Sequence, residues 1–305
     1  MSTATVRVPA KVNLALGVGP KRADGFHPLA TVYHAIDLHD ELRAVASDHG
    51  EVRLSVHGDL GERDEAAVVP LGEDNLAVRA ARLLQCHGEV QRGVDLALHK
   101  VIPVAGGMAG GSADAAAALV ACNEVWGLGL GRAELETFAG QLGSDVPFLL
   151  HGGTAIGTGR GEAISPVLAR GSYHWVCAIS PRGLSTPSVF AEFDRLTEGF
   201  AVPDPRVPEA LLAALRAGDP EQLGEALEND LTAAALSLRP ELQDTLDIGL
   251  EAGALGALVS GSGPTTVFLA ADEQHGMDIA VALASTTMCA DVVQSRGPVP
   301  GARLV

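Results

Sequence analysis

The sequence predicts a two-domain α/β protein. The chain has 305 residues, which is enough for two domains of ordinary size. Hydrophobic residues make up 47% of it, enough to fill a core in each domain. Strand-like alternation of apolar and polar residues occurs in both halves, between stretches with the spacing of helices. We expect the two domains to be residues 1–152 and 153–305.

The first half begins as sheet and continues with helices. Five segments have the alternation of strands: 6–8, 12–18, 30–38, 51–57 and 94–101. Three segments have the spacing of helices: 75–84, 113–126 and 132–142. Asp74 is the expected N-cap of the first helix, and Gly143 ends the third because glycine suits a left-handed terminal residue.

The second half combines a small sheet with several short helices. We expect a hairpin over residues 148–164 and a central strand over 173–180. Prolines stand where four helical patterns begin, as suits a first turn: Pro187, Pro208, Pro220 and Pro240. Residues 257–270 are predicted to form two strands joined by a tight turn, followed by a helix and a strand near 290–294.

Charge and composition exclude several classes of protein. The formal net charge is -17, and a negative surface repels nucleic acid and anionic lipid where no basic patch offsets it. The sequence shows no such patch, and no run of apolar residues approaches the ~18 of a spanning helix. Four widely spaced cysteines lack zinc or redox spacing. We therefore expect a cytoplasmic protein, monomer or homodimer, without nucleic-acid or membrane partners.

A glycine-rich run, PVAGGMAGGSADAAAA from Pro103, lies between a predicted strand and a predicted helix. Glycines let the backbone approach an anion, and a helix N-terminus presents unpaired N–H groups to it. The run lacks the lysine-serine ending of a Walker loop and the spaced glycines of a dinucleotide fingerprint. Close helix packing explains the same glycines. Phosphate is the natural ligand, and Ser112 is either an N-cap or a contact to phosphate or Mg²⁺.

Three polar residues accompany this run. Lys11 and Asn13 alternate with Val12 and so share one face of the first strand region. A lysine there is costly to bury without an anionic partner, and an edge-strand charge is the alternative. Asp145 follows a helix end, where a turn or capping role is the alternative. A kinase acting on an alcohol needs a carboxylate near the hydroxyl and a cation, which Asp145 and Lys11 supply if the fold joins them.

In this order the motifs resemble the GHMP superfamily of small-molecule kinases, which has an early lysine strand, a central glycine-serine loop and a late glycine turn. The last corresponds to SGSGP from Ser260. RADGFHPL from Arg22, with PAKVNL before it and LGSDVPF after the loop, resembles one family, the kinases of 4-diphosphocytidyl-2-C-methyl-D-erythritol. This resemblance spans nearly the whole chain.

The resemblance implies a GHMP-kinase-like fold of the α+β type with its active site in the cleft between the domains. Residues 1–152 would bind ATP, and residues 153–305 would bind the substrate together with residues of about 11–30. The implied reaction moves the γ-phosphoryl group of ATP to the 2-hydroxyl of the cytidyl substrate, giving the 2-phosphate and ADP. It requires Mg²⁺ and belongs to the non-mevalonate (MEP) route to isoprenoid precursors.

The resemblance also implies roles for individual residues. Asp145 would be the general base, Lys11 would orient it and stabilise charge, and Asn13 would lie beside the accepting hydroxyl. The cytosine would be held by Phe26 and His27, with Thr186 beside the substrate. The implied ATP site comprises Asn75, Pro103, Ala105, Gly106, Gly107, Met108, Ala109, Gly110, Gly111, Ser112, Ala113, Gly261, Ser262 and Gly263. Helix capping explains Asn75 equally well, and Ser112 is the candidate metal contact.

Some positions depart from the family pattern. Phe26 replaces the usual tyrosine and loses its hydroxyl. Ala109 replaces a common glycine and narrows the range of backbone conformations open to the loop. Ala113 replaces a serine. Two alternatives stay open: a related kinase of mevalonate, homoserine or a sugar, and a catalytically silent nucleotide-binding sensor. The first has no use for a cytosine clamp, and retention of Lys11 and Asp145 argues against the second.

Overall fold

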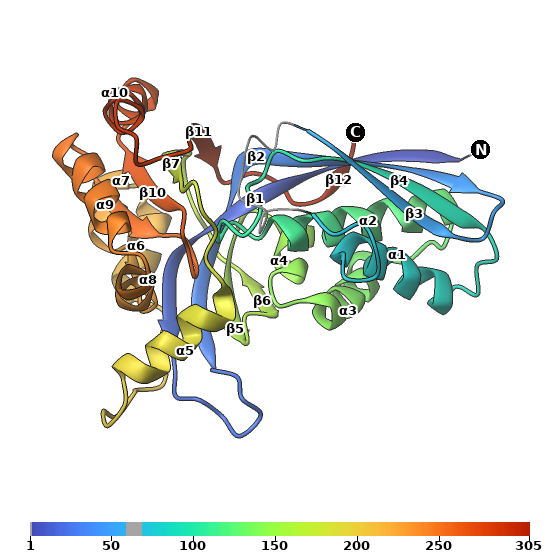
Figure 1. The fold of residues 1–305 in the computed structure, drawn as a ribbon, viewed down its shortest axis with the longest axis horizontal. Coiled ribbons are helices and arrows are strands. Elements are labelled where there is room, and N and C mark those ends of the chain that lie inside the picture. Colours follow the sequence, from blue (N-terminus) through green and yellow to red (C-terminus); the bar gives the residue numbers. More distant parts are fainter. Residues whose placement is uncertain (1, 59–68) are drawn as a thin grey trace.

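The computed structural model describes residues 2–58 and 69–305, which form two sheets with helices packed against them (Figure 1). The first sheet has the strand order β12-β1-β2-β4-β3, with β8 beside β1, β5 beside β2 and β6 beside β5. Its strands are β1 (Thr3–Val18), β2 (Leu29–Ser47), β3 (Val52–His57), β4 (Gly93–His99), β5 (Thr154–Gly159), β6 (Ala163–Pro166), β8 (Glu228–Asn229) and β12 (Arg303–Leu304).

The second sheet has the order β11-β7-β10-β9 and is antiparallel. Its strands are β7 (Tyr173–Ile179), β9 (Gly256–Val259), β10 (Thr266–Ala270) and β11 (Asp291–Gly297). Six helices belong to this half of the described chain: α5 (Thr186–Leu196), α6 (Glu209–Ala217), α7 (Pro220–Glu225), α8 (Thr232–Leu238), α9 (Glu241–Glu251) and α10 (Glu273–Ala284). α9 and α10 pack on its strands.

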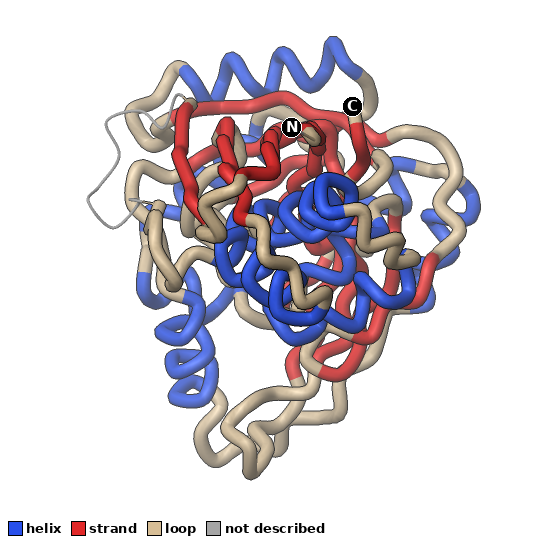
Figure 2. The backbone as a smooth tube through the Cα atoms, turned by 90° about the vertical axis from the view of Figure 1, so that its right-hand side faces the viewer, coloured by secondary structure: helices blue, strands red, loops and turns tan. Residues whose placement is uncertain are grey.

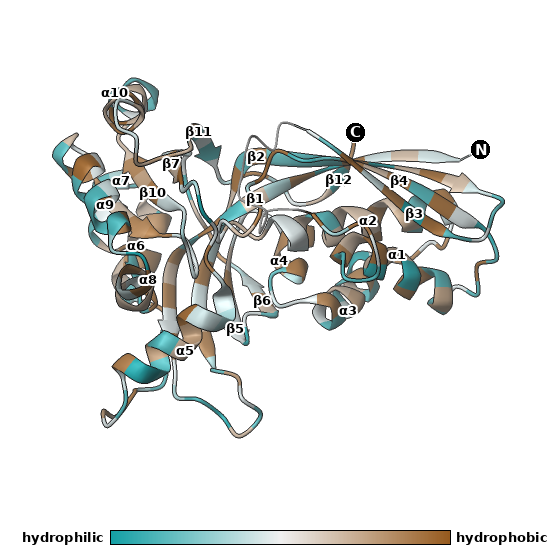
Figure 3. Ribbon diagram, in the orientation of Figure 1, coloured by the Kyte–Doolittle hydropathy of each residue, from teal (hydrophilic) through white to brown (hydrophobic). Residues whose placement is uncertain are grey.

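The core of the first half lies between its sheet and four helices, α1 (Leu76–His87), α2 (Gly110–Trp126), α3 (Arg132–Leu142) and α4 (Val146–His151). α2 packs against β1 and β2 on one side and against α1 on another. Its alanines are fully buried, so neighbouring backbones approach closely, and Figure 3 shows hydrophobic colours around it. A buried α2 places its N-terminus at a defined point inside the molecule.

The two halves share strands at several points. β8 pairs with the end of β1 through Ala15 and Leu16, and β12 pairs with the start of β1, so both termini lie close together (Figure 2). β5 and β6 belong to the first sheet, and the chain enters the second sheet only at Tyr173. The division after residue 152 stays a prediction, and the sheet assignment favours a later one, between Pro166 and Tyr173.

Several predicted boundaries were wrong. The N-cap of α1 is Asn75, whose Oδ1 accepts a hydrogen bond from the Ala77 amide at 2.8 Å, and not Asp74. The second predicted helix begins at Gly110 because the loop ends in a left-handed Ala109, so Ser112 lies within the first turn. The expected hairpin over 148–164 starts later, since the apolar run after Pro147 forms α4.

The prolines behave in two ways. Pro187 and Pro220 stand in the first turns of α5 and α7, as predicted. Pro208 and Pro240 instead occupy the N-cap positions of α6 and α9, one residue before each helix. In residues 2–58 and 69–305, no helix is both long and apolar enough to cross a membrane.

Candidate active site

A cavity of about 650 Å³ lies where the glycine loop, β1, β2, α5 and the late glycine turn meet. Residues far apart in the sequence line it, including Lys11 and Asn13 from β1, Gly106, Gly107 and residues 109–112 from the glycine loop and α2, and Asp145. Phe26 and His27 line the same cavity, together with Thr186 from α5. The structure thus brings the predicted phosphate site and the predicted substrate site into one space.

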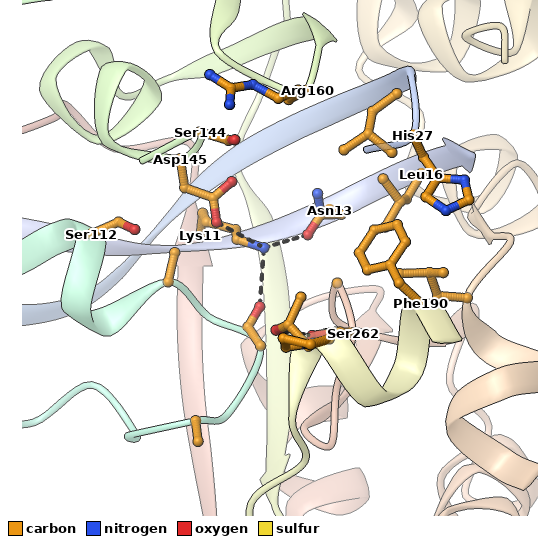
Figure 4. Close-up of a pocket in the computed structure, with 18 of the residues that line it drawn as sticks. Lys11, Asn13, Leu16, His27, Ser112, Ser144, Asp145, Arg160, Phe190 and Ser262 are labelled. Atoms are coloured by element: carbon orange, nitrogen blue, oxygen red, sulfur yellow. Dashed lines mark hydrogen bonds and ion pairs between the residues drawn. The ribbon is translucent and has the colours of Figure 1, made fainter. Parts of the chain in front are cut away.

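Lys11 and Asn13 lie side by side on β1 (Figure 4). The Lys11 ammonium donates hydrogen bonds to Asn13 Oδ1 at 2.5 Å and to the Gly107 carbonyl at 3.0 Å. Its side chain is buried, and its backbone N–H donates to the Met108 carbonyl, which excludes an edge-strand charge. Burial lowers the pKa of Lys11 below its ordinary value, and the Asp145 charge partly offsets this.

Asp145 points its carboxylate at Lys11 from the start of α4 (Figure 4). Its Oδ2 lies 4.0 Å from the Lys11 ammonium, and its Oδ1 accepts a hydrogen bond from the Tyr33 hydroxyl at 2.8 Å. Although Asp145 occupies the N-cap position of α4, its side chain makes no capping hydrogen bond within the described part of the chain. The capping alternative therefore does not account for this carboxylate.

The glycine loop turns sharply between Pro103 and α2. Ala105 and Ala109 are both left-handed, with φ of 52° and 60°, although neither is glycine. Gly107, with φ of 77°, must be glycine, because a Cβ atom there would collide with the Ser260 carbonyl. The first turn of α2 follows at once and lines the cavity through Gly110, Gly111 and Ser112. The N–H groups of a first helical turn have no intrahelical partner, so they are available to an anion.

Ser112 is the third residue of α2, and the N-cap position belongs to Ala109. Ser112 lines the cavity. Its contact with a phosphate or a metal stays a prediction. Four residues of the predicted ATP site do not line the cavity: Asn75, Met108, Ala113 and Gly263. Met108 and Ala113 are fully buried in the core, and Asn75 caps α1. Any contact of these residues with ATP stays a prediction.

The late glycine turn closes the cavity from the second half of the chain. The Ser260 hydroxyl donates to the Gly107 carbonyl at 3.1 Å, so this carbonyl receives both Ser260 and Lys11. A Cβ atom on Gly261 would lie 3.1 Å from the Lys11 ammonium. Asn229 donates from its amide to the Val259 and Gly261 carbonyls at 2.7 Å each. The turn is thereby fixed against β1 and the glycine loop.

Aromatic side chains gather at the other end of the cavity. His27 is buried and donates from Nδ1 to the Gly19 carbonyl at 2.8 Å, while its Nε2 lies 3.2 Å from an Asp194 carboxylate oxygen. Its ring centroid is 5.3 Å from that of Phe190. Phe26 is 52% exposed, and the Arg160 guanidinium lies 5.2 Å from its ring centroid. This end can hold a flat ring, with a cation close by.

The sequence analysis missed several cavity residues, among them Tyr33, Arg160, Phe190 and Asp194. Phe190 lies four residues after Thr186 on α5, so helical spacing was a signal that could have found it. Thr186 itself shares a hydrogen bond of 2.8 Å with the Ser262 hydroxyl. Nothing in the local sequence marks Tyr33 as a partner of Asp145.

Two family patterns match this chain. The pattern of the GHMP kinases N terminal domain matches residues 75–153, and that of the GHMP kinases C terminal matches residues 211–287. The 4-diphosphocytidyl-2-C-methyl-D-erythritol kinase of Thermobifida fusca (strain YX) is 55% identical over 307 residues, covering 100% of this chain and 99% of its own. The kinase of the same name from Salinispora arenicola (strain CNS-205) is 54% identical, covering 98% and 93%.

Solved structures agree with the fold. A crystal structure of 4-(cytidine 5'-diphospho)-2C-methyl-D-erythritol kinase has a TM-score of 0.74 at 32% identity and covers 95% of this chain and 98% of its own. L. major mevalonate kinase, solved with R-mevalonate, has a TM-score of 0.72 at 16% identity, covering 96% and 95%, and shows the fold alone. The predicted two-domain fold is confirmed. This chain belongs to the GHMP kinases and, among them, to the family of 4-diphosphocytidyl-2-C-methyl-D-erythritol kinases.

Proposed function

We propose that this protein transfers the γ-phosphoryl group of ATP to the 2-hydroxyl of 4-diphosphocytidyl-2-C-methyl-D-erythritol, giving the 2-phosphate and ADP in the MEP pathway. One observation carries the proposal: the first turn of α2, a lysine-aspartate pair and a cluster of aromatic side chains line a single cavity. The relatives that cover the whole chain at more than 50% identity bear the name of this activity.

The ATP phosphates bind at the first turn of α2 in this proposal. Gly110 and Gly111 leave that turn open to the cavity, and the helix dipole favours negative charge there. The glycine loop brings further backbone N–H groups close without side chains in the way. Lys11 lies 3.0 Å from the Gly107 carbonyl and so sits between this phosphate site and Asp145.

Mg²⁺ fits the oxygen donors of this cavity. Mg²⁺ binds in proteins through one or two carboxylates together with substrate phosphates, and it keeps several waters. Ser112 lines the cavity from the first turn of α2, beside the proposed phosphate site. The described residues hold no group of three or more His, Cys, Asp or Glu side chains suited to a metal. We therefore propose that most of its ligands would be ATP phosphates and water; when bound, it would neutralise phosphate charge.

Catalysis then depends on positioning and charge. Asp145 accepts the proton of the 2-hydroxyl as the oxygen forms its bond to the γ-phosphorus, and the bond to the β-phosphate oxygen breaks to release ADP. Lys11 stabilises the charge that develops on the transferred group, while Asn13 holds the lysine in place at 2.5 Å. Because Lys11 and Asn13 are buried, they need little reorganisation during the reaction.

The aromatic end of the cavity distinguishes this substrate from the other alcohols. Phe26, His27 and Phe190 provide apolar surface and a polar ring suited to a pyrimidine. Mevalonate, homoserine and simple sugars carry no aromatic ring and would leave this clamp empty. A silent nucleotide-binding sensor would have no use for the Lys11–Asp145 pair.

Substitution of Asp145 by asparagine tests the reaction. Asp145→Asn should lower kcat by roughly 10²-fold or more, the usual scale of general-base loss, while ATP affinity stays within about twofold. ADP release with the cytidyl substrate, with mevalonate and with homoserine measures turnover and specificity. Turnover of the cytidyl substrate close to that of the unmodified enzyme would remove Asp145 from the mechanism.

Asp219→Asn provides a matched control. Asp219 is the N-cap of α7 and accepts hydrogen bonds from the Glu221 and Gln222 amides at 3.0 and 3.1 Å. It does not line the cavity. This variant should keep its kcat and change the free energy of unfolding by less than about 0.5 kcal/mol, because asparagine caps a helix start about as well as aspartate. Preferential phosphorylation of mevalonate or homoserine by the unmodified enzyme would contradict the proposed substrate.

A further inference from the structure

We infer that Tyr33 is a positioning residue for phosphoryl transfer, which holds Asp145 by one carboxylate oxygen and leaves the other for the substrate hydroxyl. The inference rests on the proposed function of Asp145 and deepens it. Tyr33 lies in β2, 112 residues before Asp145, and the two meet because β2 and the start of α4 border the same cavity. The Tyr33 hydroxyl donates to Asp145 Oδ1 at 2.8 Å.

The Tyr33 ring is held on several sides. It is 2% exposed and stacks on Phe148 of α4, with ring centroids 4.8 Å apart and an angle of 23° between the planes. The β5–β6 hairpin packs over it through two glycines. A Cβ atom on Gly157 would lie 2.5 Å from the Tyr33 ring, and one on Gly161 would collide with the hydroxyl. The hydroxyl is therefore fixed in position before any substrate binds.

This hydroxyl donates its hydrogen bond throughout the working range of pH. Burial, and then the neighbouring Asp145 charge, raise the pKa of Tyr33 well above its ordinary value. Lys11 from β1 also faces this region, with its ammonium 5.9 Å from the Tyr33 ring centroid. Arg160 and Glu162, from the turn between β5 and β6, complete the charged groups around the pair.

The two oxygens of Asp145 consequently have different surroundings. Oδ1 is occupied by the Tyr33 hydroxyl, and Oδ2 faces the Lys11 ammonium at 4.0 Å, on the side where the first turn of α2 opens. Oδ2 is thus the oxygen that takes the proton of the 2-hydroxyl. A hydrogen bond donated to a carboxylate favours its charged form, which is the form that a base requires.

Tyr33→Phe removes the hydroxyl and keeps the packed ring. A hydrogen bond to a charged group has a net value that corresponds to a rate change of about tenfold. The maximal kcat should fall roughly tenfold because the carboxylate is no longer fixed, while KM for ATP stays within about twofold. In the Asp145→Asn background, Tyr33→Phe should add almost no further loss, because the two residues act as a unit.

Tyr173 provides a matched control, since the chain has only two tyrosines. Tyr173 is also 2% exposed, and its hydroxyl has no hydrogen-bond partner among the residues that the structure describes. Tyr173→Phe should leave kcat unchanged. An undiminished kcat in Tyr33→Phe, or a further loss of about tenfold when it is added to Asp145→Asn, would overturn the inference.

A second measurement separates this inference from the proposed reaction. In protein labelled with ¹³C at aspartate carboxyl groups, the Asp145 signal is identified by its loss in Asp145→Asn. At a fixed pH, the chemical shift of this carboxyl carbon should change in Tyr33→Phe and stay in place in Tyr173→Phe. This measurement needs no substrate, so an unchanged chemical shift would refute the role of Tyr33 even if the cytidyl substrate is phosphorylated. If that substrate is not phosphorylated, the chemical shift still decides whether Tyr33 holds Asp145.

Discussion

Cations are scarce in this chain, with 21 Lys and Arg against 38 Asp and Glu, so those that line the cavity carry particular weight. Lys11 faces Asp145, and Lys21 is 2.5 Å from an Asp194 carboxylate oxygen. Arg160 is paired more loosely, with its Nε 3.7 Å from Glu162, and its guanidinium lies over the exposed Phe26 ring. Arg160 lines the same cavity as the aromatic clamp and Asp145, so we expect it to meet the diphosphate of the cytidyl substrate.

Arg160→Met should raise KM for the cytidyl substrate about tenfold, since a hydrogen bond to a charged group contributes at least about 1.5 kcal/mol. Methionine retains a long apolar side chain and removes the charge. KM for ATP should change by less than about twofold because ATP is proposed to bind at the other end of the cavity. Steady-state kinetics with each substrate varied in turn measure both constants.

Arg53→Met is the matched control for this prediction. Arg53 lies on β3, where it pairs with the exposed Glu51 and does not line the cavity. This variant should alter neither KM. Equal increases in both KM values on substitution of Arg160 would show that its effect is general and not directed at the diphosphate.

Residues close in sequence were predictable, whereas partners from distant segments were not. The alternation of Lys11 and Asn13 about Val12 correctly placed both side chains on one face of β1. The contact between Tyr33 and Asp145 depends on how β2, α4 and the β5–β6 hairpin pack, which no local pattern specifies. The left-handed Ala109 is a similar case, because its φ is set by the loop around it and not by its own preference.

At the scale of elements, a buried ionic cluster connects β2, the end of β4 and α2. The Lys100 ammonium donates to Asp40 and, at 3.0 Å, to Asp114, and all three side chains are buried. Asp40 also accepts hydrogen bonds from the Val101 and Ile102 amides at 2.6 and 2.8 Å. The cluster lies directly beneath Gly110, so it supports the first turn of α2, where the phosphates are proposed to bind.

Lys100→Met should lower the free energy of unfolding by about 3–5 kcal/mol, the usual loss when one partner of a buried ion pair is removed. Two buried carboxylates would remain without their cation. Urea unfolding at pH 5 and at pH 8 measures the loss at each pH. Lys21→Met, which removes a half-exposed lysine, is the control and should lose at most about 1 kcal/mol.

The loss in Lys100→Met should be larger at pH 8 than at pH 5. Burial already raises the pKa of Asp114 to about 7 in the intact cluster, against an ordinary value of 3.8. A raised pKa of a carboxyl gives a stabilising contribution that is complete below the unfolded value and is lost as the pH rises through the folded value. Removal of the Lys100 ammonium raises the pKa of Asp114 further. Asp114 is then protonated at pH 5 in the variant, so less charge is left buried without a partner than at pH 8. Equal losses at both pH values would contradict this assignment.

Element types were mostly predictable from periodicity, but their starting points were not. The alanine-rich pattern correctly predicted α2, yet its first turn includes Gly110 and Gly111, residues with poor helix propensity. Tertiary contacts outweigh that propensity here, because α2 is anchored by the buried Asp114 and by its packing against β1 and β2. α4 was missed because a helix of six residues carries too little periodic signal.

On the scale of the whole molecule, two loops separated by about 150 residues form one structure. The Gly107 carbonyl accepts from Lys11 of β1 and from Ser260, which begins the late glycine turn. Both glycine motifs were evident in the sequence, and the family resemblance implied a cleft between the domains. That one carbonyl joins both motifs to the lysine was not predictable, because the contact requires both halves in their final places.

Substitution of Gly107 should therefore affect stability and activity together. In Gly107→Ala the added Cβ atom would meet the Ser260 carbonyl, and its left-handed φ alone disfavours alanine by about 1–2 kcal/mol. We expect a loss of at least that size in the free energy of unfolding. Activity should also fall, because separation of the loops removes the Gly107 carbonyl from the Lys11 ammonium. Urea unfolding and ADP release measure the two effects.

Gly111→Ala provides the comparison within the same motif. Gly111 is helical, and the atom nearest to an added Cβ would be Leu76 Cδ1 at 3.8 Å, an ordinary contact. The free energy of unfolding of the Gly111→Ala variant should rise by about 0.5–1 kcal/mol, since alanine has a higher helix propensity than glycine. Opposite changes in stability would locate the role of Gly107 in the junction between the halves. Equal losses in both variants would instead mean that the motif requires glycine throughout for reasons of backbone flexibility.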